Sequence, residues 1–254
     1  MMESKLVAIE KKKNIAIIKL SHKSTNAISL ELVEELSKAV NSVKADDSLR
    51  ALVLTSANEK FLSIGFDIPS LLPLAQEQFT EFYRAFNQLC LDLYTLPKPT
   101  VAGINGHAIA GGCILALCCD VRVIADDRKL IGLNEVKLGV PVPYVADRIL
   151  HALIGARHAR EVMELGEFYP PDDAQRIGLV DYVQPQDQVL DKALEQARLL
   201  SMAPGEAFAL VKANRVESVM VEILERLEVK QLRFVDCWYA DAARQPLKDA
   251  GTKF

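Results

Sequence analysis

The sequence has no excess of positive charge and no apolar run of transmembrane length. Its 254 residues carry 30 Lys and Arg against 34 Asp and Glu, a net charge of −4. Because phosphate backbones are bound mainly by cationic side chains, this balance argues against nucleic acid as the main partner. The longest apolar segment, residues 108–119, contains two glycines and is shorter than the ~18 residues a membrane-spanning helix needs. We therefore expect neither a nucleic-acid nor a membrane partner.

Cysteine and histidine are few, and neither is spaced as a set of metal ligands. The five cysteines are an odd number, include no C-x-x-C pair, and place three members in one apolar segment. We therefore expect buried, reduced thiols and no bound metal. The N-terminal stretch MMESKLVAIEKKK contains acids and lacks the apolar centre of a signal peptide, so a cytoplasmic location is expected.

The apolar residues, half of the chain, recur with the periods of both strands and helices. Two alternating segments around KKKN predict a hairpin. A continuous apolar run predicts a buried strand at residues 51–55, a second buried strand is predicted at residues 101–104, and a further strand at residues 121–125. Helical spacing predicts a helix at residues 30–43, with Ser29 as N-cap, and another at residues 79–96. This alternation of strand and helix indicates an α/β architecture.

The last third of the chain has a different pattern. Beyond Pro143 nearly every segment is helical in period, apart from a short run at residues 180–183. PPDDAQRIG has the Pro and Asp typical of a helix start, and long amphipathic helices are predicted at residues 190–200 and 219–239. The last of these carries Phe234, Trp238 and Tyr239, which we expect to pack on a neighbour.

The turn GHAIAGG lies between a predicted strand and an apolar helix. Gly111 and Gly112 allow close approach of a ligand to the backbone. The first amides of a helix have no partner within it, and the helix dipole favours negative charge there. Such a turn suits an oxyanion, although a Gly-Gly corner also serves tight packing.

A second loop, FLSIGFD, also follows a predicted strand. Gly65 gives close backbone access, and the N–H of Phe66 is a candidate second donor. The alternative is an ordinary turn in which Asp67 caps the segment that follows.

Glu135 stands in the apolar stretch LIGLNEVKLGVPVP. A carboxylate among aliphatic side chains has a raised pKa, because burial disfavours its charged form, and a raised pKa suits proton transfer near neutral pH. The alternative is a Glu that begins a helix or forms a salt bridge.

Taken together and in this order, these segments resemble the enoyl-CoA hydratase/isomerase (crotonase) superfamily. The resemblance extends through KSTNAISLELVEEL, LRALVLTS, HAIAGGCILALCCDVRVIADD and LGEFYPPDDAQRIGLVDYVQP. It implies a ClpP-like spiral of β-β-α units with a helical C-terminal region that makes trimers or hexamers. We place the core at residues 1–195 and the trimerisation region at residues 196–254.

The resemblance also implies the ligand and the residues that hold it. The ligand would be an acyl-CoA thioester, with no separate cofactor because CoA is part of the substrate. The backbone N–H groups of Phe66 and Gly111 would form the oxyanion hole, with Glu135 as the acid/base. Substrate contacts, mostly through the backbone, are implied for Lys23, Ser24, Asn26, Ser63, Ile64, Gly65, Asp67, Gly112 and Ile114.

Ile114 separates the branches of this superfamily. Hydratases usually carry a second Glu at this position, whereas LNEVKLGVPVP is similar to the Δ3,Δ2-enoyl-CoA isomerases, which use one Glu. The resemblance therefore implies that Glu135 shifts a proton through an oxyanion-stabilised dienolate. Two features depart from the family: Ile64 replaces a small Ala, where it can crowd the thioester or move the loop, and the terminal helix is short.

Three other functions compete with isomerisation. Glu135 alone can serve a hydratase or another thioester-enolate reaction. Ile64 favours a non-catalytic CoA-binding protein. An RNA-binding role, known in one part of the superfamily, is disfavoured by the acidic balance.

Overall fold

The computed structural model describes residues 6–252 and contains two sheets, a large one and a small one. The large sheet has six strands in the order β1-β2-β3-β5-β7-β10, in which β1 and β2 form the predicted antiparallel hairpin and the remaining pairs are parallel. Its strands are β1 (Val7–Lys12), β2 (Ile15–Leu20), β3 (Ala51–Ser56), β5 (Thr100–Ile104), β7 (Val121–Ala125) and β10 (Tyr182–Gln184).

The small sheet has the order β4-β6-β8-β9. Its strands are β4 (Phe61–Ser63), β6 (His107–Ile109), β8 (Ile131–Gly132) and β9 (Phe168–Tyr169). The sequence pattern assigns β4 and β6 to loops or turns and predicts no strand at β8 or β9. The chain places β3, β5 and β7 in the large sheet and the strand that follows each of them in the small sheet, and a helix comes after each pair. The α/β class and the repeated β-β-α unit expected from the resemblance are therefore confirmed.

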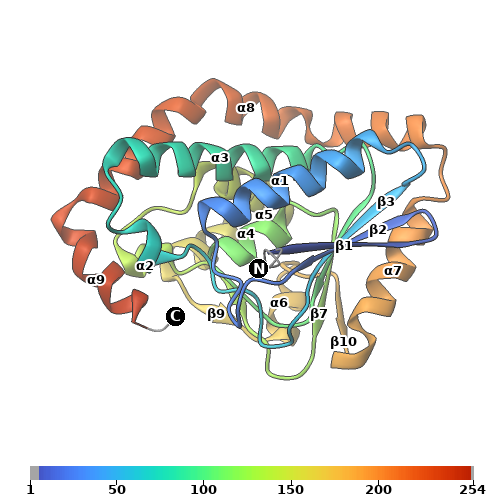
Figure 1. Ribbon diagram of the computed structural model, residues 1–254, viewed down its shortest axis with the longest axis horizontal. Helices are drawn as coiled ribbons and strands as arrows, with labels where there is room; N and C mark the ends of the chain where they lie inside the picture. The colour runs from blue at the N-terminus through green and yellow to red at the C-terminus, as the bar shows by residue number, and fades with distance from the viewer. Residues whose placement is uncertain (1–5, 253–254) are drawn as a thin grey trace, which may run out of the picture.

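Helices cover both faces of the large sheet (Figure 1). On one face, Ile18, Leu52 and Leu54 join the main core with α1 and α3, whereas on the other face Ile17 and Val53 pack against α7. The helices are α1 (Leu30–Ala45), α2 (Ile68–Leu71), α3 (Gln76–Tyr94), α4 (Gly111–Leu117), α5 (Tyr144–Leu165), α6 (Pro171–Arg176), α7 (Val189–Leu200), α8 (Gly205–Tyr239) and α9 (Asp241–Gly251), with 3-10 turns η1 (Glu135–Leu138) and η2 (Gln186–Gln188).

The predicted helices agree best where one apolar face is continuous. In α1, Ser29 caps the first turn by accepting a hydrogen bond from the Leu32 amide, as expected. Helix α3 begins three residues before the predicted start at Phe79, since the Gln78 side chain accepts from the Ala75 amide there. Helix α8 begins at Gly205, much earlier than the predicted residue 219. The sequence pattern missed its first turns because they are largely exposed and lack an apolar stripe.

The aromatic residues near the end of α8 do pack on a neighbour, and that neighbour is α3 of the same chain. Phe234 stacks on Tyr83 with ring centroids 4.1 Å apart, and Trp238 stacks on Phe79 at 4.3 Å. The Tyr239 hydroxyl donates to the Leu74 carbonyl at 2.7 Å. Figure 1 shows α8 lying along α3 as a result of these contacts.

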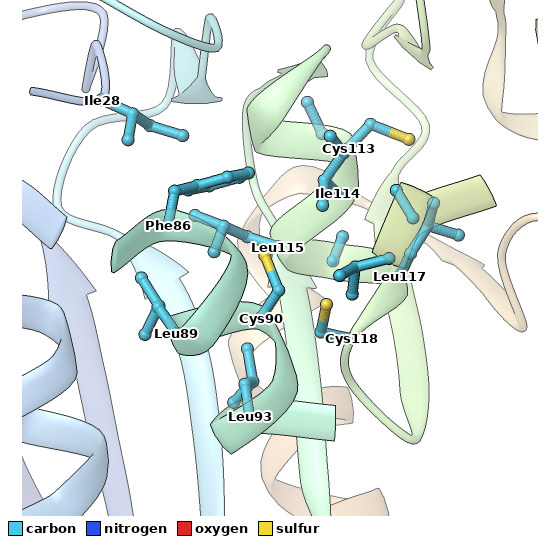
Figure 2. Close-up of a cluster of buried hydrophobic side chains, with 14 of the residues drawn as sticks. Ile28, Phe86, Leu89, Cys90, Leu93, Cys113, Ile114, Leu115, Leu117 and Cys118 are labelled. Carbon is cyan, nitrogen blue, oxygen red and sulfur yellow. The ribbon is translucent and has the colours of Figure 1, made fainter. Parts of the chain in front are cut away.

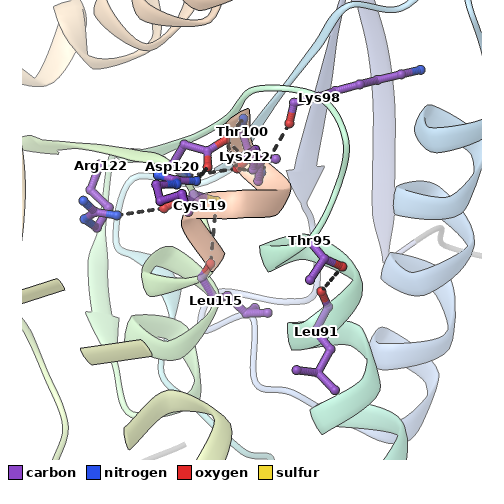
Figure 3. A network of polar contacts seen from close by, with 10 residues as sticks. Leu91, Thr95, Lys98, Thr100, Leu115, Cys119, Asp120, Arg122 and Lys212 are labelled. Carbon is purple, nitrogen blue, oxygen red and sulfur yellow. Dashed lines mark hydrogen bonds and ion pairs between the residues drawn. The ribbon is translucent and has the colours of Figure 1, made fainter. Parts of the chain in front are cut away.

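The first half of α8 is tied to the sheet by a buried charge network (Figure 3). The Lys212 ammonium donates to the Asp120 carboxylate at 2.9 Å, and the same carboxylate accepts from the Thr100 amide at 2.8 Å and pairs with Arg215. Lys212 is only 3 % exposed, and burial lowers its pKa. These contacts fix the far part of the chain against β5 and β7.

The cysteines are buried, free thiols in the main core, except for half-buried Cys237. Figure 2 shows Cys90 on α3 beside Leu115 and Cys118 of the next helical layer. Burial raises the pKa values of Cys113 and Cys119, so these thiols stay protonated. The expectation of buried, reduced thiols is confirmed for four of the five. No helix within residues 6–252 is both long and apolar enough to cross a membrane.

Candidate functional site

Three short parallel strands of the small sheet bring three loops to one edge. The chain leaves β4 at Ser63, β6 at Ile109 and β8 at Gly132, and each strand ends next to a segment singled out in the sequence. Because the carboxyl ends of parallel strands meet at one edge of a sheet, Phe66, Gly111 and Glu135 are gathered there.

The two glycine turns lie against each other, which explains why they need glycine. Gly65 has φ +103°, and a Cβ on it would lie 2.9 Å from the Ala110 Cβ and 3.2 Å from the Gly111 nitrogen. A Cβ on Gly112 would lie 2.3 Å from the Ser63 carbonyl oxygen. Side chains at either position would force the turns apart, so the close approach depends on both glycines.

The amides of Phe66 and Gly111 are available to a ligand. Within residues 6–252 neither amide donates a hydrogen bond, although the amides of Asp67 and Ala110 beside them do. Gly111 begins α4, where the N–H groups have no partner inside the helix and the dipole favours negative charge. Both residues line the same cavity, so the two donors open into one space.

Glu135 begins η1 and is 6 % exposed. Its Oε2 is buried with no hydrogen-bond partner among the described residues. Burial raises its pKa from 4.5 to about 7, while the backbone amides of Glu135 and Asn134 oppose part of this rise. The alternative of a salt-bridged Glu is therefore not what the structure contains, because the described ion pairs do not include Glu135.

A cavity of about 410 Å³ joins the donor turns to Glu135. Among the described residues that line it, Glu135 is the single carboxylate, and Ile114 on α4 contributes an aliphatic wall. Ile64 also lines the cavity, yet the contact between the two glycine turns is intact. The other lining residues are mostly apolar: Phe61, Phe66, Ile68, His107, Ile109, Ala110, Gly111, Leu130, Asn134, Leu138, Val140, Pro143, Phe168, Phe234, Trp238, Leu247 and Ala250.

Several residues assigned to the substrate do not line this cavity. Lys23 and Ser24 are exposed on the loop before Asn26. The Asn26 amide is fully buried and donates to the Ser56 hydroxyl and the Leu62 carbonyl. The Ser63 hydroxyl donates to the Asn26 carbonyl. These side chains hold the loop in shape, so any role in binding rests on the backbone and stays a prediction.

Asp67, Gly65 and Gly112 have structural roles in or beside the two glycine turns. Asp67 caps α2, as the alternative interpretation of FLSIGFD expected, by accepting from the Ser70 amide. Gly65 and Gly112 are buried and contribute by letting the loops approach. Their substrate contacts likewise stay predictions.

Sequence patterns missed the wall supplied by distant segments. Phe234 and Trp238 come from α8, and Leu247 and Ala250 from α9, more than ninety positions after Glu135 in the chain. No local motif signals their arrival at the cavity. His107, by contrast, lies within the GHAIAGG turn, so its place in the chain is a signal that could have found it.

Comparisons with known proteins agree on one family. Residues 10–246 match the family model described as enoyl-CoA hydratase/isomerase. The chain is 38 % identical over 243 residues to mouse "Enoyl-CoA delta isomerase 1, mitochondrial", covering 95 % of this chain and 84 % of the relative. It is also 29 % identical over 249 residues to a crotonyl-CoA hydratase of Syntrophomonas wolfei, covering 98 % and 94 %.

Solved structures give the same result. The crystal structure of human mitochondrial delta3-delta2-enoyl-CoA isomerase matches with a TM-score of 0.94 and 30 % identity, covering 98 % of this chain and 97 % of the other. An enoyl-CoA hydratase from Bacillus halodurans matches with a TM-score of 0.88 at 24 % identity, which supports the fold alone.

Proposed function

Because the chain belongs to the enoyl-CoA hydratase/isomerase family, we propose that it isomerises 3-enoyl-CoA thioesters to 2-enoyl-CoA thioesters, as part of fatty-acid or related acyl-CoA metabolism. The observation that carries this proposal is the single carboxylate among the described residues of the cavity wall. Hydration needs a water to be activated and a proton to be delivered, and two carboxylates divide that work. Moving one proton along the same acyl chain needs one.

In the proposed reaction, ionised Glu135 removes a proton from C2 of the acyl chain. The electron pair delocalises, and the resulting dienolate carries its negative charge on the thioester oxygen. Glu135, now protonated, returns the proton to C4. A pKa of about 7 suits both halves of this exchange, because the group is readily ionised and readily reprotonated near neutral pH.

The thioester oxygen would accept hydrogen bonds from the Phe66 and Gly111 amides. Preorganised donors of this kind contribute about 3–4 kcal/mol each to transition-state stabilisation in related chemistry. The unpaired state of both amides and their shared cavity support this role. A thioester α-proton is weakly acidic, so the donors and the base are both required.

The test is the rate of Glu135→Gln on a 3-enoyl-CoA, followed by the absorbance of the conjugated product. We expect a fall of about a hundredfold or more, since acid–base help from a positioned group is of that order. Glu217→Gln, at an exposed position of α8, is the matched control and should retain the parent rate. An unchanged rate in Glu135→Gln would sink the proposal.

A 2-enoyl-CoA substrate separates isomerisation from hydration. Efficient formation of 3-hydroxyacyl-CoA would identify a single-carboxylate hydratase, the activity that the name of the Syntrophomonas relative carries. Binding of CoA without turnover of any enoyl-CoA would identify a non-catalytic binding protein instead. Either outcome replaces the isomerase proposal.

We also propose a homotrimer or hexamer in the cytoplasm. Exposed aliphatic side chains along α8 support self-association, because contiguous apolar surface favours protein contacts; they are Leu210, Val211, Val221, Leu224, Val229 and Leu232. A monomeric mass by light scattering would contradict the trimer. Recovery of the protein from mitochondria, the location in the names of the mouse and human relatives, would contradict the cytoplasmic assignment.

A further inference from the structure

The cavity wall divides by element into a helical part and a part made by the small sheet. The helical part comes from α2, α4, α8 and α9 and is apolar and aromatic. The sheet part includes Phe61, Ile109 and Phe168, with Leu130 just before β8, again apolar, but it also holds one polar side chain, His107. Apart from Asn134 and Glu135 the rest of the wall is apolar, so a further polar side chain at His107 requires a physical reason.

His107 is held in one orientation and one tautomer. Its Nδ1 accepts a hydrogen bond from the Leu130 backbone N–H at 3.0 Å. The ring also packs against Phe61, with ring centroids 5.3 Å apart. A neutral imidazole that accepts at Nδ1 carries its proton on Nε2. Within residues 6–252 that Nε2 makes no hydrogen bond, and it is not among the fully buried unpaired atoms, so it is an accessible donor.

The charge state of the ring points the same way. Partial burial lowers the His107 pKa below its ordinary value of 6.5, and the ammonium groups of Lys129 and Lys60 lower it further. The ring is therefore neutral at physiological pH. A neutral donor among apolar side chains suits a neutral acceptor such as an amide carbonyl, whereas phosphates are bound by cations and helix N-termini.

We propose that the His107 Nε2–H donates a hydrogen bond to an amide carbonyl of the pantetheine arm of the thioester ligand. This rests on the proposed acyl-CoA function. The thioester oxygen lies at the Gly111 amide in that proposal. His107 begins β6, which runs about 7 Å to Ile109, and Gly111 follows two residues later, so both residues lie on the segment that lines this side of the cavity. In CoA a short ethylene link separates the sulfur from the nearer amide, so this amide reaches the same region of the wall.

Two substitutions separate binding from the packing of the histidine. In His107→Asn, the side-chain oxygen can occupy the position of Nδ1 and still accept from the Leu130 amide. The Asn side chain is too short to place a donor at the position of Nε2. A Gln side chain reaches the place of Nε2 and preserves the donor. We therefore expect His107→Asn to bind a saturated acyl-CoA about 2-fold to 10-fold more weakly, the range for one neutral hydrogen bond. His107→Gln should bind close to the parent affinity.

Truncated thioesters identify the acceptor. The same acyl group is presented as its CoA, pantetheine and S-ethyl thioesters, with affinity measured by calorimetry or by displacement of a fluorescent acyl-CoA. The loss in His107→Asn should appear with CoA and pantetheine and vanish with the amide-free S-ethyl thioester. The series is repeated with an acyl group that carries an oxygen. A loss that appears only with that acyl group would assign the donor to the acyl chain and overturn the proposal.

Other outcomes also overturn it. Weak binding by His107→Gln with parent affinity in His107→Asn would mean that the contact with Leu130 is what matters. Equal losses for all three thioesters would indicate a change in cavity shape. If the folded parent protein binds no CoA thioester at all, the proposed function itself fails, which is a different result from any change confined to the variants.

Discussion

Replacing Glu135 by Gln should make the protein more stable above neutral pH, although it removes the proposed base. The reason is the burial of an ionisable group whose Oε2 has no partner among the described residues. Its pKa rises from 4.5 to about 7 on folding. At about 1.4 kcal/mol per pH unit, keeping this carboxylate ionised in the folded state costs about 3 kcal/mol.

The sign of the effect follows from proton binding. With the folded pKa above the unfolded value, the folded state binds the proton more tightly, so the parent protein carries no penalty from Glu135 below about pH 4.5. Stability falls as the pH rises from there to about 7, and the full cost of about 3 kcal/mol applies above that pH. A Gln side chain is neutral throughout and escapes this cost.

Urea unfolding of the parent and of Glu135→Gln at pH 5 and pH 8, at equal protein concentration, measures the difference. The stability gain of the variant should be larger at pH 8 than at pH 5 by about 2 kcal/mol or more. Glu217→Gln, exposed on α8, should show no such dependence on pH. A gain that is equal at both pH values, or absent, would refute the claim that burial raises this pKa.

Three further results are expected. The isomerisation kcat/KM should rise with pH through about 7 and then level off, because this ratio reports the free protein, in which Glu135 must be ionised to act. A flat profile across this range contradicts the role of the base. Gly112→Ala should lower the free energy of unfolding by about 1–3 kcal/mol and lower kcat, because the new Cβ meets the Ser63 carbonyl. Gly205→Ala, whose Cβ would have its nearest neighbour at 3.5 Å, should leave both stability and kcat unchanged. Asp120→Asn should lower the free energy of unfolding by about 3 kcal/mol, because buried Lys212 loses the carboxylate it pairs with. Asp191→Asn is the control, since the Asp191 side chain is 81 % exposed, and an equal loss of stability in it would refute this reasoning.

Local patterns were sufficient for most elements of the fold. The strands β3, β5 and β7 are short, mostly apolar and almost entirely buried, and α1 carries one apolar stripe and its own cap. These signals are contained in consecutive residues. The short strands β4, β6 and β8 are only two or three residues long, so no period develops in them, and the sequence pattern predicted no strand at any of them.

The candidate site divides in the same way. The glycine turns and the carboxylate among aliphatic residues are visible in the chain, and the family resemblance is enough to join them into one predicted site. Whether Glu135 forms a salt bridge depends on which charges reach it, and that is decided by packing. In the folded chain its Oε2 is buried without a partner among the described residues, and burial raises its pKa.

By itself the sequence determined the α/β class, the family and the three segments that meet at the site, because each depends on residues close together in the chain. The tertiary structure alone decided what surrounds them. Only folding brings Phe234, Trp238 and Leu247 to the cavity, sets Gly65 against Gly111, and brings the Ile114 side chain into the wall of the cavity that Glu135 lines. The physical reason is that burial, electrostatics and cavity shape are properties of contacts between distant segments, which no local pattern encodes.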